Sequence, residues 1–140
     1  MIILDTNVLS EATRVSPSVE VRSWLAARIK AELFTTTVSE AEMLGGVIAL
    51  PAGKRRDELA RDFSHVFDEE FADRILSFDS AAARAFPVVA RRVHGKYFFE
   101  PDAQIAAIAL AHGAVIATRN TRHFKGRGVK LINPWTGEQT

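Results

Sequence analysis

The chain begins MIILDTNVLSE (residues 1–11), a stretch in which the apolar run Ile2 to Leu4 ends at one carboxylate, Asp5. Short apolar runs of this kind are typical of buried strands in parallel sheets. Ligands of such sheets bind beyond the C-terminal ends of the strands, which is the position of Asp5. The segment DTN also suits a helix start, because all three side chains accept bonds from backbone N–H groups. The residue pattern leaves both roles open for Asp5.

Short apolar runs alternate with longer helical patterns along the rest of the chain, which predicts crossover units around a mostly parallel sheet. The expected strands cover residues 2–5, 33–37, 74–79, 114–118 and 129–133. The expected helices are one after the first strand, 17–30 with Ser16 as its cap, 38–50, 53–70, 80–95 with Pro87 kinking or breaking it and Gly95 ending it, and 100–112. We expect one α/β domain over residues 1–140, with a central five-stranded sheet flanked by helices.

The composition limits the kinds of site that the chain can hold. The 140 residues are 47% apolar and 25% charged, and none is cysteine, so any metal has oxygen or imidazole ligands. Neither a signal peptide nor a membrane span is indicated, and we expect a soluble cytoplasmic protein. Residues 1–70 hold 8 Lys/Arg and 12 Asp/Glu, whereas residues 71–140 hold 10 and 5. The basic half is compatible with a polyanion-binding face, although solvated surface charge also explains it.

Further polar side chains lie at positions where a site is expected. Asp102 begins the helix 100–112 on its inward face, and Asn120 follows the fourth strand by two residues. If the first and fourth strands are neighbours, Asp5 and Asn120 approach each other. Near the start of the helix 38–50, two capping boxes are possible: Thr37 with Glu40, or Ser39 with Glu42. Sequence physics does not decide which glutamate faces the core, because this helix is apolar on nearly every side.

Carboxylates without a nearby Lys or Arg repel one another unless a cation joins them. Oxygen ligands favour Mg²⁺, with Mn²⁺ also suited, and such ions support phosphodiester cleavage by water. We assign surface or packing roles to the four scattered histidines, because none has metal-ligand spacing: His65, His94, His112 and His123. Neither a glycine-rich phosphate loop nor a serine nucleophile motif is present.

Four segments in this order resemble the PIN-domain ribonucleases: ILDTNVLSE, TTVSEAEMLGGV, PDAQIAAIA and ATRNTRHF. The resemblance is to the VapC toxins of bacterial toxin–antitoxin pairs and to the related FitB branch, and it extends to INPW near the C-terminus. It implies a PIN-like fold and a Mg²⁺-dependent endoribonuclease. It further implies homodimers, a VapB-like antitoxin partner, and operator DNA bound through the antitoxin.

Carried over residue by residue, the resemblance implies catalytic roles for Asp5, Glu42, Asp102 and Asn120. It assigns Glu42 because E-x-x-x-G-V matches Glu42, Gly46 and Val47, which leaves Glu40 a capping role. We expect one Mg²⁺ on Asp5 and Asp102, with Glu42 and Asn120 acting through water. Asn120 stands where many members have aspartate. This departure leaves one alternative, a catalytically weakened PIN-like binding module that acts through its antitoxin and DNA complex.

Residues around these positions receive supporting roles. Thr6 and Asn7 are expected to hold the turn at the strand end, and Thr118 and Arg119 to lie at the rim of the site. Several basic residues are candidates for contacts with the RNA backbone: Arg91, Arg92, Lys96, Arg119, Arg122 and Lys125. Transfer, ribosomal and messenger RNA all remain possible substrates.

Overall fold

Strand β1 (Ile2–Leu4) occupies the centre of a five-stranded sheet with the order β3-β2-β1-β6-β7. The other strands are β2 (Leu33–Thr36), β3 (Ile75–Leu76), β6 (Val115–Ala117) and β7 (Lys130–Ile132). All four strand pairs are parallel in this computed structural model, which describes residues 1–140. The five strands lie inside the predicted ranges, and the expected single α/β domain is confirmed.

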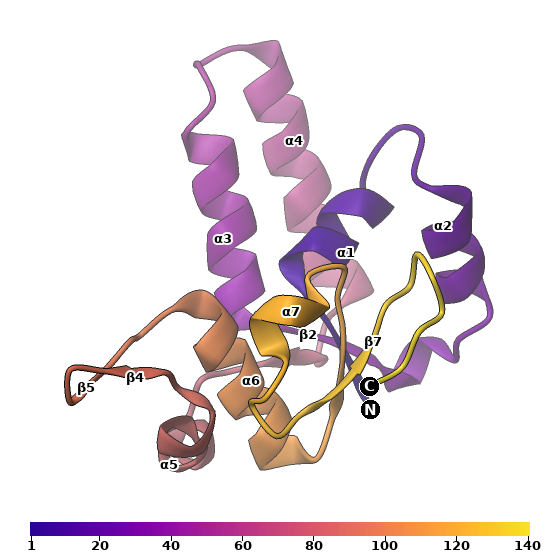
Figure 1. Ribbon diagram of the computed structural model, residues 1–140. Coiled ribbons are helices and arrows are strands. Elements are labelled where there is room, and N and C mark those ends of the chain that lie inside the picture. Colours follow the sequence, from indigo (N-terminus) through magenta and orange to yellow (C-terminus); the bar gives the residue numbers. More distant parts are fainter.

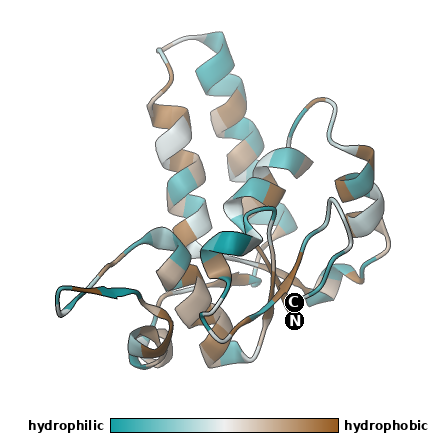
Figure 2. Cartoon of the chain, in the orientation of Figure 1, coloured by the Kyte–Doolittle hydropathy of each residue, from teal (hydrophilic) through white to brown (hydrophobic).

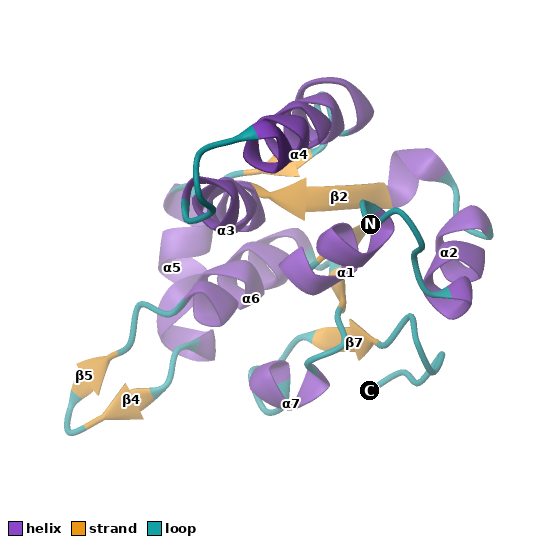
Figure 3. Ribbon diagram, turned by 90° about the horizontal axis from the view of Figure 1, so that it is seen from above, coloured by secondary structure: helices purple, strands orange, loops and turns teal.

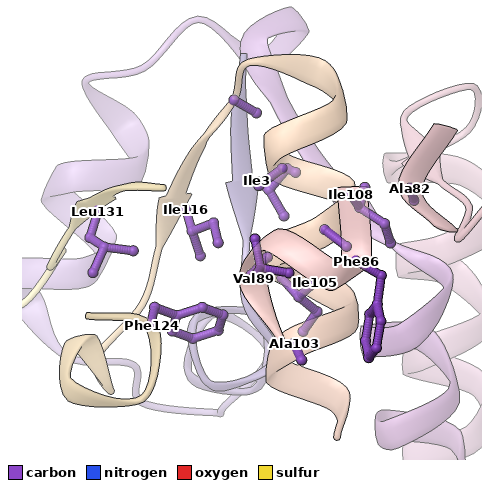
Figure 4. Close-up of a cluster of buried hydrophobic side chains, with 14 residues drawn as sticks. Ile3, Ala82, Phe86, Val89, Ala103, Ile105, Ile108, Ile116, Phe124 and Leu131 are labelled. Atoms are coloured by element: carbon purple, nitrogen blue, oxygen red, sulfur yellow. The ribbon is translucent and has the colours of Figure 1, made fainter. Parts of the chain in front are cut away.

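Alternate residues of the central strands point to opposite faces of the sheet, as the pleat requires. Ile3, Ile116 and Leu131 join a core with α5 and α6, and Phe124 of α7 completes it (Figure 4). The next residues along the same strands, Leu4, Ala117 and Ile132, join a second core with α1 to α4. The sheet is therefore covered on both faces, and only its edges remain open for a site.

Seven helices surround the sheet: α1 (Thr6–Ala12), α2 (Val19–Ala26), α3 (Thr37–Ile48), α4 (Lys54–His65), α5 (Ser80–Val89), α6 (Pro101–His112) and α7 (Thr121–Phe124). A 3₁₀ turn (Lys30–Glu32) precedes β2, and a π-helical turn (Val66–Glu70) continues α4. Helices α3 and α4 project together from the body, and the two chain ends lie near each other (Figure 1). Seen from above, α1 lies between α2 on one side and α3 and α6 on the other (Figure 3).

Helix α6 shows how the sequence sets these elements. Pro101 occupies its first turn, and Gly113 follows its end in the left-handed conformation, with φ 60°, as the sequence predicts. Residues Ala103 to Ala109 are buried except Gln104, which is half-buried, because the helix packs between the sheet and α5. Hydrophilic residues instead dominate α4 and α7 (Figure 2). Asp102 therefore begins a helix whose middle is packed between the sheet and α5.

Two local predictions are wrong, and of the two effects predicted for Pro87 the break does not occur. Helix α5 continues past Pro87 to Val89, and the chain then forms a hairpin of β4 (Arg92–Val93) and β5 (Lys96–Tyr97). His94 and Gly95, both with positive φ, form its two-residue turn instead of a helix end. Helix α2 begins at Val19 with Ser18 as its cap, because Ser18 Oγ accepts the Val21 N–H.

The sequence also predicts that α3 is buried on nearly every side, and this is wrong as well. Only Ser39, Met43 and Val47, at intervals of four residues, are buried. Leu44 and Ile48 on the other side are 38% and 66% exposed, because α3 projects beyond the sheet. In the whole chain, no helix is long and apolar enough to cross a membrane.

Candidate active site

A polar hollow of about 320 Å³ opens at the C-terminal edge of the sheet. Its lining contains no apolar residue and no Lys or Arg, and consists of Asp5, Thr6, Asn7, Ser10, Glu42, Asp102 and Asn120. The structure thus brings together all four residues that the sequence singles out: Asp5, Glu42, Asp102 and Asn120. We call this hollow the acidic pocket, since three of its side chains are carboxylates without a cationic neighbour in the lining.

The position of Asp5 follows from the order of the strands. Because β1 and β6 are neighbours, their C-terminal ends meet at one edge, and the Asp5 N–H donates to the Ala117 carbonyl at 3.0 Å. Asp5 ends β1 and Asn120 lies three residues beyond Ala117, so both side chains reach the same hollow. The prediction that these residues approach each other if their strands are adjacent is confirmed.

Asp5 is only 3% exposed, and it accepts three hydrogen bonds. The Thr6 N–H donates to Oδ1 at 2.8 Å, while Asn7 Nδ2 and the Thr118 hydroxyl donate to Oδ2 at 2.5 and 2.7 Å. Burial raises the pKa of the Asp5 carboxyl to about 6, against the lowering effect of the Thr118 and Thr6 bonds. The nearby carboxylates of Asp102 and Glu42 raise the pKa further. Asp5 thus N-caps α1 and also carries an unfavourable buried charge.

Thr118 belongs to this centre and not to its rim, which corrects the expectation from sequence. Its side chain is fully buried, and besides donating to Asp5 it accepts from Asn7 Nδ2 at 3.1 Å and from the Asn120 N–H at 3.0 Å. Thr118 therefore joins the ends of β1 and β6. Arg119 is exposed, as expected for a rim residue.

Glu42 reaches the pocket from α3. Thr36 caps that helix by accepting the Ser39 N–H at 3.1 Å, so neither predicted capping box forms, and Glu40 has no capping bond. The helix starts one residue earlier than the Thr37 box assumes and three residues earlier than the Ser39 box assumes. Glu42 is exposed, and its carboxylate accepts the Thr6 hydroxyl. This bond links α3 to the turn that follows Asp5.

His123 contacts the site, which the sequence did not reveal. Its Nδ1 lies 3.0 Å from Asp102 Oδ2, and the two side chains are 42% and 32% exposed. The sequence predicts a surface or packing role for this histidine, and the structure adds a contact with a residue of the acidic pocket. No spacing within α7 signals this contact, because Asp102 belongs to another helix, α6.

A second residue that the sequence did not reveal, Arg127, fixes the elements that carry Asp102 and His123. Arg127 is 5% exposed. Its Nε donates to the His123 carbonyl at 2.8 Å and its Nη1 to the Val89 carbonyl at 2.7 Å, while Nη2 pairs with Glu100. One buried guanidinium thus joins α7, the end of α5 and the start of α6.

The donors of the acidic pocket suit a hard divalent cation, because they are carboxylate, hydroxyl and amide groups. The buried Asp5 charge near two other carboxylates supports the same conclusion, since a cation relieves their repulsion. No group of three or more Asp, Glu, His or Cys side chains is positioned to hold a metal ion alone. A bound ion would therefore keep several waters, as Mg²⁺ commonly does.

A comparison with protein families matches residues 2–128 of the chain to the PIN domain. The chain belongs to the PIN-domain family. This PIN domain is 40% identical over 137 residues to plasmid stability protein StbB of Pseudomonas syringae pv. tomato, covering 96% of this chain and 99% of that protein. It is 37% identical to VapC ribonuclease Y4jK of Sinorhizobium fredii, covering 96% and 98% of the two chains, and 36% identical to toxin FitB of Neisseria gonorrhoeae, covering 96% and 99%. The sequence resemblance is confirmed.

Solved structures agree with the PIN fold. FitAB bound to a DNA fragment contains a chain that matches this PIN domain with a TM-score of 0.87 at 36% identity, covering 99% of this chain and 98% of that one. FitAcB from Neisseria gonorrhoeae matches with a TM-score of 0.83 at 35% identity, covering 97% and 99%. The five-stranded sheet and its flanking helices are therefore those of the family.

Proposed function

We propose that this PIN domain is a Mg²⁺-dependent endoribonuclease, with Mn²⁺ as a possible substitute, and the toxin of a VapBC-type pair. One observation carries the proposal: the acidic pocket gathers Asp5, Glu42 and Asp102 at the edge of the sheet, with no Lys or Arg in the lining. Such a pocket repels a phosphodiester unless a cation is present. The relationship to a VapC ribonuclease supports RNA as the substrate.

In this proposal, Asp5 and Asp102 hold the cation, and Glu42 and Asn120 act through water. Asp5 is the most rigid ligand, because three donors fix its carboxylate. Asp102 has Oδ1 available, since Oδ2 contacts His123. When bound, the cation neutralises phosphate charge and makes water a stronger nucleophile.

The other side chains position and exchange protons. Glu42 is exposed and held by Thr6, so its free carboxylate oxygen can accept a proton from the attacking water. Asn120 has no side-chain capping bond, which leaves its amide free to orient that water. Water attacks the phosphorus, the P–O bond opposite to it breaks, and the departing ribose oxygen takes a proton from solvent water.

A VapB-like antitoxin is the proposed partner. A separate hollow of about 480 Å³ between α1, α2 and α4 has apolar walls that include Leu9, Leu25 and Phe71. Charged residues such as Arg28 and Glu70 surround it, so an amphipathic segment matches this surface. The FitAB complex with DNA supports operator binding through the antitoxin.

A homodimer is also part of the proposal. Large apolar side chains remain exposed on α3, on α5 and beside the hairpin, three elements that lie on the left in Figure 1. They include Ile48, Val88 and Phe99, which are 66%, 70% and 68% exposed. Burial of this side against a second copy is the expected assembly.

The alternative is a binding module with weakened catalysis, and Asn120 is the observation that favours it. An amide supplies one neutral oxygen where many family members supply a carboxylate. If this explanation holds, Asn120→Asp raises the cleavage rate substantially above a near-zero wild-type rate. In the nuclease proposal, the wild-type protein already cleaves RNA.

The experiment incubates purified, antitoxin-free protein with RNA and MgCl₂. Wild-type protein is expected to cleave internally, and EDTA to stop cleavage. Asp5→Asn, Asp102→Asn and Glu42→Gln are expected to lower the rate by roughly 100-fold or more. Glu40→Gln, two residues before Glu42 on the same helix, is the matched control and keeps the rate. Absent wild-type cleavage, or equal rates for Asp5→Asn and wild type, contradicts the proposal.

A further inference from the structure

We propose that a second hollow beside the acidic pocket binds the RNA nucleotide next to the scissile phosphate, an inference that rests on the proposed ribonuclease function. This hollow has a volume of about 520 Å³ and is lined by Asn7, Ser10, Glu11, Arg14, Arg119 and Trp135. We call it the flanking pocket. It is open to solvent. Its lining carries two arginines and one glutamate, so its net charge is opposite to that of the acidic pocket.

The two pockets are continuous along α1. Asn7 and Ser10 line both of them. Asn7 also connects them chemically, because its Nδ2 donates to Asp5 at 2.5 Å and its Oδ1 accepts the Arg119 N–H at 3.0 Å. The backbone of Arg119 is therefore fixed relative to the proposed metal ligand. A polymer that places one phosphate in the acidic pocket extends past Asn7 to Arg119.

The wall of the flanking pocket carries two flat side chains. The Arg119 guanidinium lies 5.2 Å from the centroid of the Trp135 ring. Trp135 is half-buried against the core on the α1 side of the sheet. Its backbone N–H donates to Asn133 Oδ1 at 3.0 Å, which fixes the turn between these two residues. Guanidinium and indole planes stack on nucleobases, and guanidinium also binds phosphate. This pair accordingly suits a nucleotide with an unpaired base.

The charges favour a nucleotide over other occupants. Arg119 forms no salt bridge, whereas Arg14 pairs with Glu11 at 3.2 Å. Arg119 thus remains available to an anion. A polyanion approaching three carboxylates needs a cationic contact close by, and Arg119 is the residue next to Asn120 of the acidic pocket. The Arg119–Trp135 pair also gives a role to the INPW motif near the C-terminus, which the cleavage chemistry itself does not use.

Tryptophan fluorescence tests the inference directly. The chain has only two tryptophans, so Trp24→Phe leaves Trp135 as the single reporter. Asp102→Asn in the same full-length chain prevents cleavage while a short oligoribonucleotide is titrated in MgCl₂. Quenching of Trp135 is expected. Arg119→Ala should weaken binding roughly tenfold. Arg119→Lys keeps the charge but lacks the planar guanidinium, and it should weaken binding roughly threefold.

Kinetics with otherwise wild-type protein provide the second readout. Arg119→Ala is expected to raise KM roughly tenfold and to change kcat by less than about twofold, because it removes binding away from the reacting phosphate. Trp135→Phe should keep most of the affinity, and Trp135→Leu should lose it. Arg55→Ala, at an exposed arginine of α4 with no salt bridge, has the same charge change and serves as the control. It should behave as the wild type.

The outcomes separate this inference from the proposed function. Quenching that Arg119→Ala weakens, together with no RNA cleavage by the wild-type protein, supports the flanking pocket and contradicts the nuclease. If the wild-type protein cleaves RNA and Arg119→Ala has the same KM and the same oligonucleotide affinity, the flanking pocket is overturned. The nuclease proposal is then still supported. Arg119→Ala that weakens only antitoxin binding also overturns it, because the pocket then takes an acidic peptide.

Discussion

His123 Nδ1 lies 3.0 Å from Asp102 Oδ2, so that α7 and α6 meet at the acidic pocket. In the tautomer that carries Nδ1–H, this contact fixes the orientation of the Asp102 carboxylate and directs its other oxygen toward the pocket. Hydrogen bonds to metal ligands of this kind tune affinity, because a freely rotating carboxylate loses entropy when it binds an ion. The contact therefore predicts a role for His123 without direct metal binding.

His123→Ala is expected to raise the Mg²⁺ concentration for half-maximal cleavage by roughly tenfold. His123→Asn, whose amide can replace the Nδ1–H, should recover most of the affinity. Titration of activity with MgCl₂ measures both effects. His112→Ala is the control, since His112 is exposed at the end of α6. Equal Mg²⁺ dependence of His123→Ala and wild type would show that the contact has no such role.

The Asp5 pKa predicts an unusual pH dependence of stability in metal-free buffer. The pKa is about 6 in the folded protein and 3.8 as the ordinary value. Between these values the folded protein binds more protons than the unfolded chain, so the free energy of unfolding falls as pH rises. The complete loss is about 3 kcal/mol, reached above pH 6.

Urea unfolding between pH 3.5 and pH 8, with EDTA present, measures this loss. Asp5→Asn cannot ionise, so its curve should lack the decrease between pH 4 and 6. Asp57→Asn on the exposed surface of α4 should follow the wild type. Saturating Mg²⁺ should also remove the decrease, because a bound cation favours the ionised carboxylate. Parallel curves for Asp5→Asn and wild type would mean that Asp5 is ionised normally.

Thr118 connects the ends of β1 and β6 through Asp5. Thr118→Val removes the donor to Asp5 and leaves Asn7 Nδ2 and the Asn120 N–H without this acceptor. The expected loss of unfolding free energy is about 2 kcal/mol. Thr35→Val is the control, because Thr35 is equally buried but makes one longer bond, 3.4 Å, to the Leu4 carbonyl. Similar losses in the two variants would contradict the special position of Thr118.

The antitoxin surface is tested by filling the apolar hollow. Ala26 is exposed and lines that hollow, so Ala26→Arg should block it without disturbing the core. Antitoxin affinity, measured by calorimetry, should fall by roughly 100-fold, and RNA cleavage should be unchanged. Ala27→Arg introduces the same side chain at the next exposed residue, which does not line the hollow. Unchanged antitoxin affinity in Ala26→Arg would place the antitoxin elsewhere.

The sequence predicts those structural features that depend on neighbouring residues in the chain. The apolar runs predicted all five strands, and Pro101 and Gly113 predicted the bounds of α6. Asp5 and Asn120 could be placed at one edge because parallel strands end together. Family resemblance added Glu42, which helix periodicity alone could not distinguish from Glu40.

Other features depend on contacts between distant segments. His123 reaches Asp102 only because α7 packs against α6, a contact that no spacing within either helix encodes. The role of Arg127 is likewise not visible in the sequence, since its partners come from α5, α6 and α7. The exposed side of α3 was missed because an apolar helix usually indicates a core. The hairpin at Gly95 was missed because a glycine with positive φ ends helices and forms two-residue turns equally well.

The central claim is that the acidic pocket directs water to a phosphodiester. Cleavage of RNA in H₂¹⁸O with MgCl₂, followed by mass spectrometry of the products, tests it most directly. We predict one ¹⁸O atom in the terminal phosphate of the wild-type product, and no product above background from Asp5→Asn. Cyclic phosphate ends without ¹⁸O, or equal product from Asp5→Asn, would contradict the account.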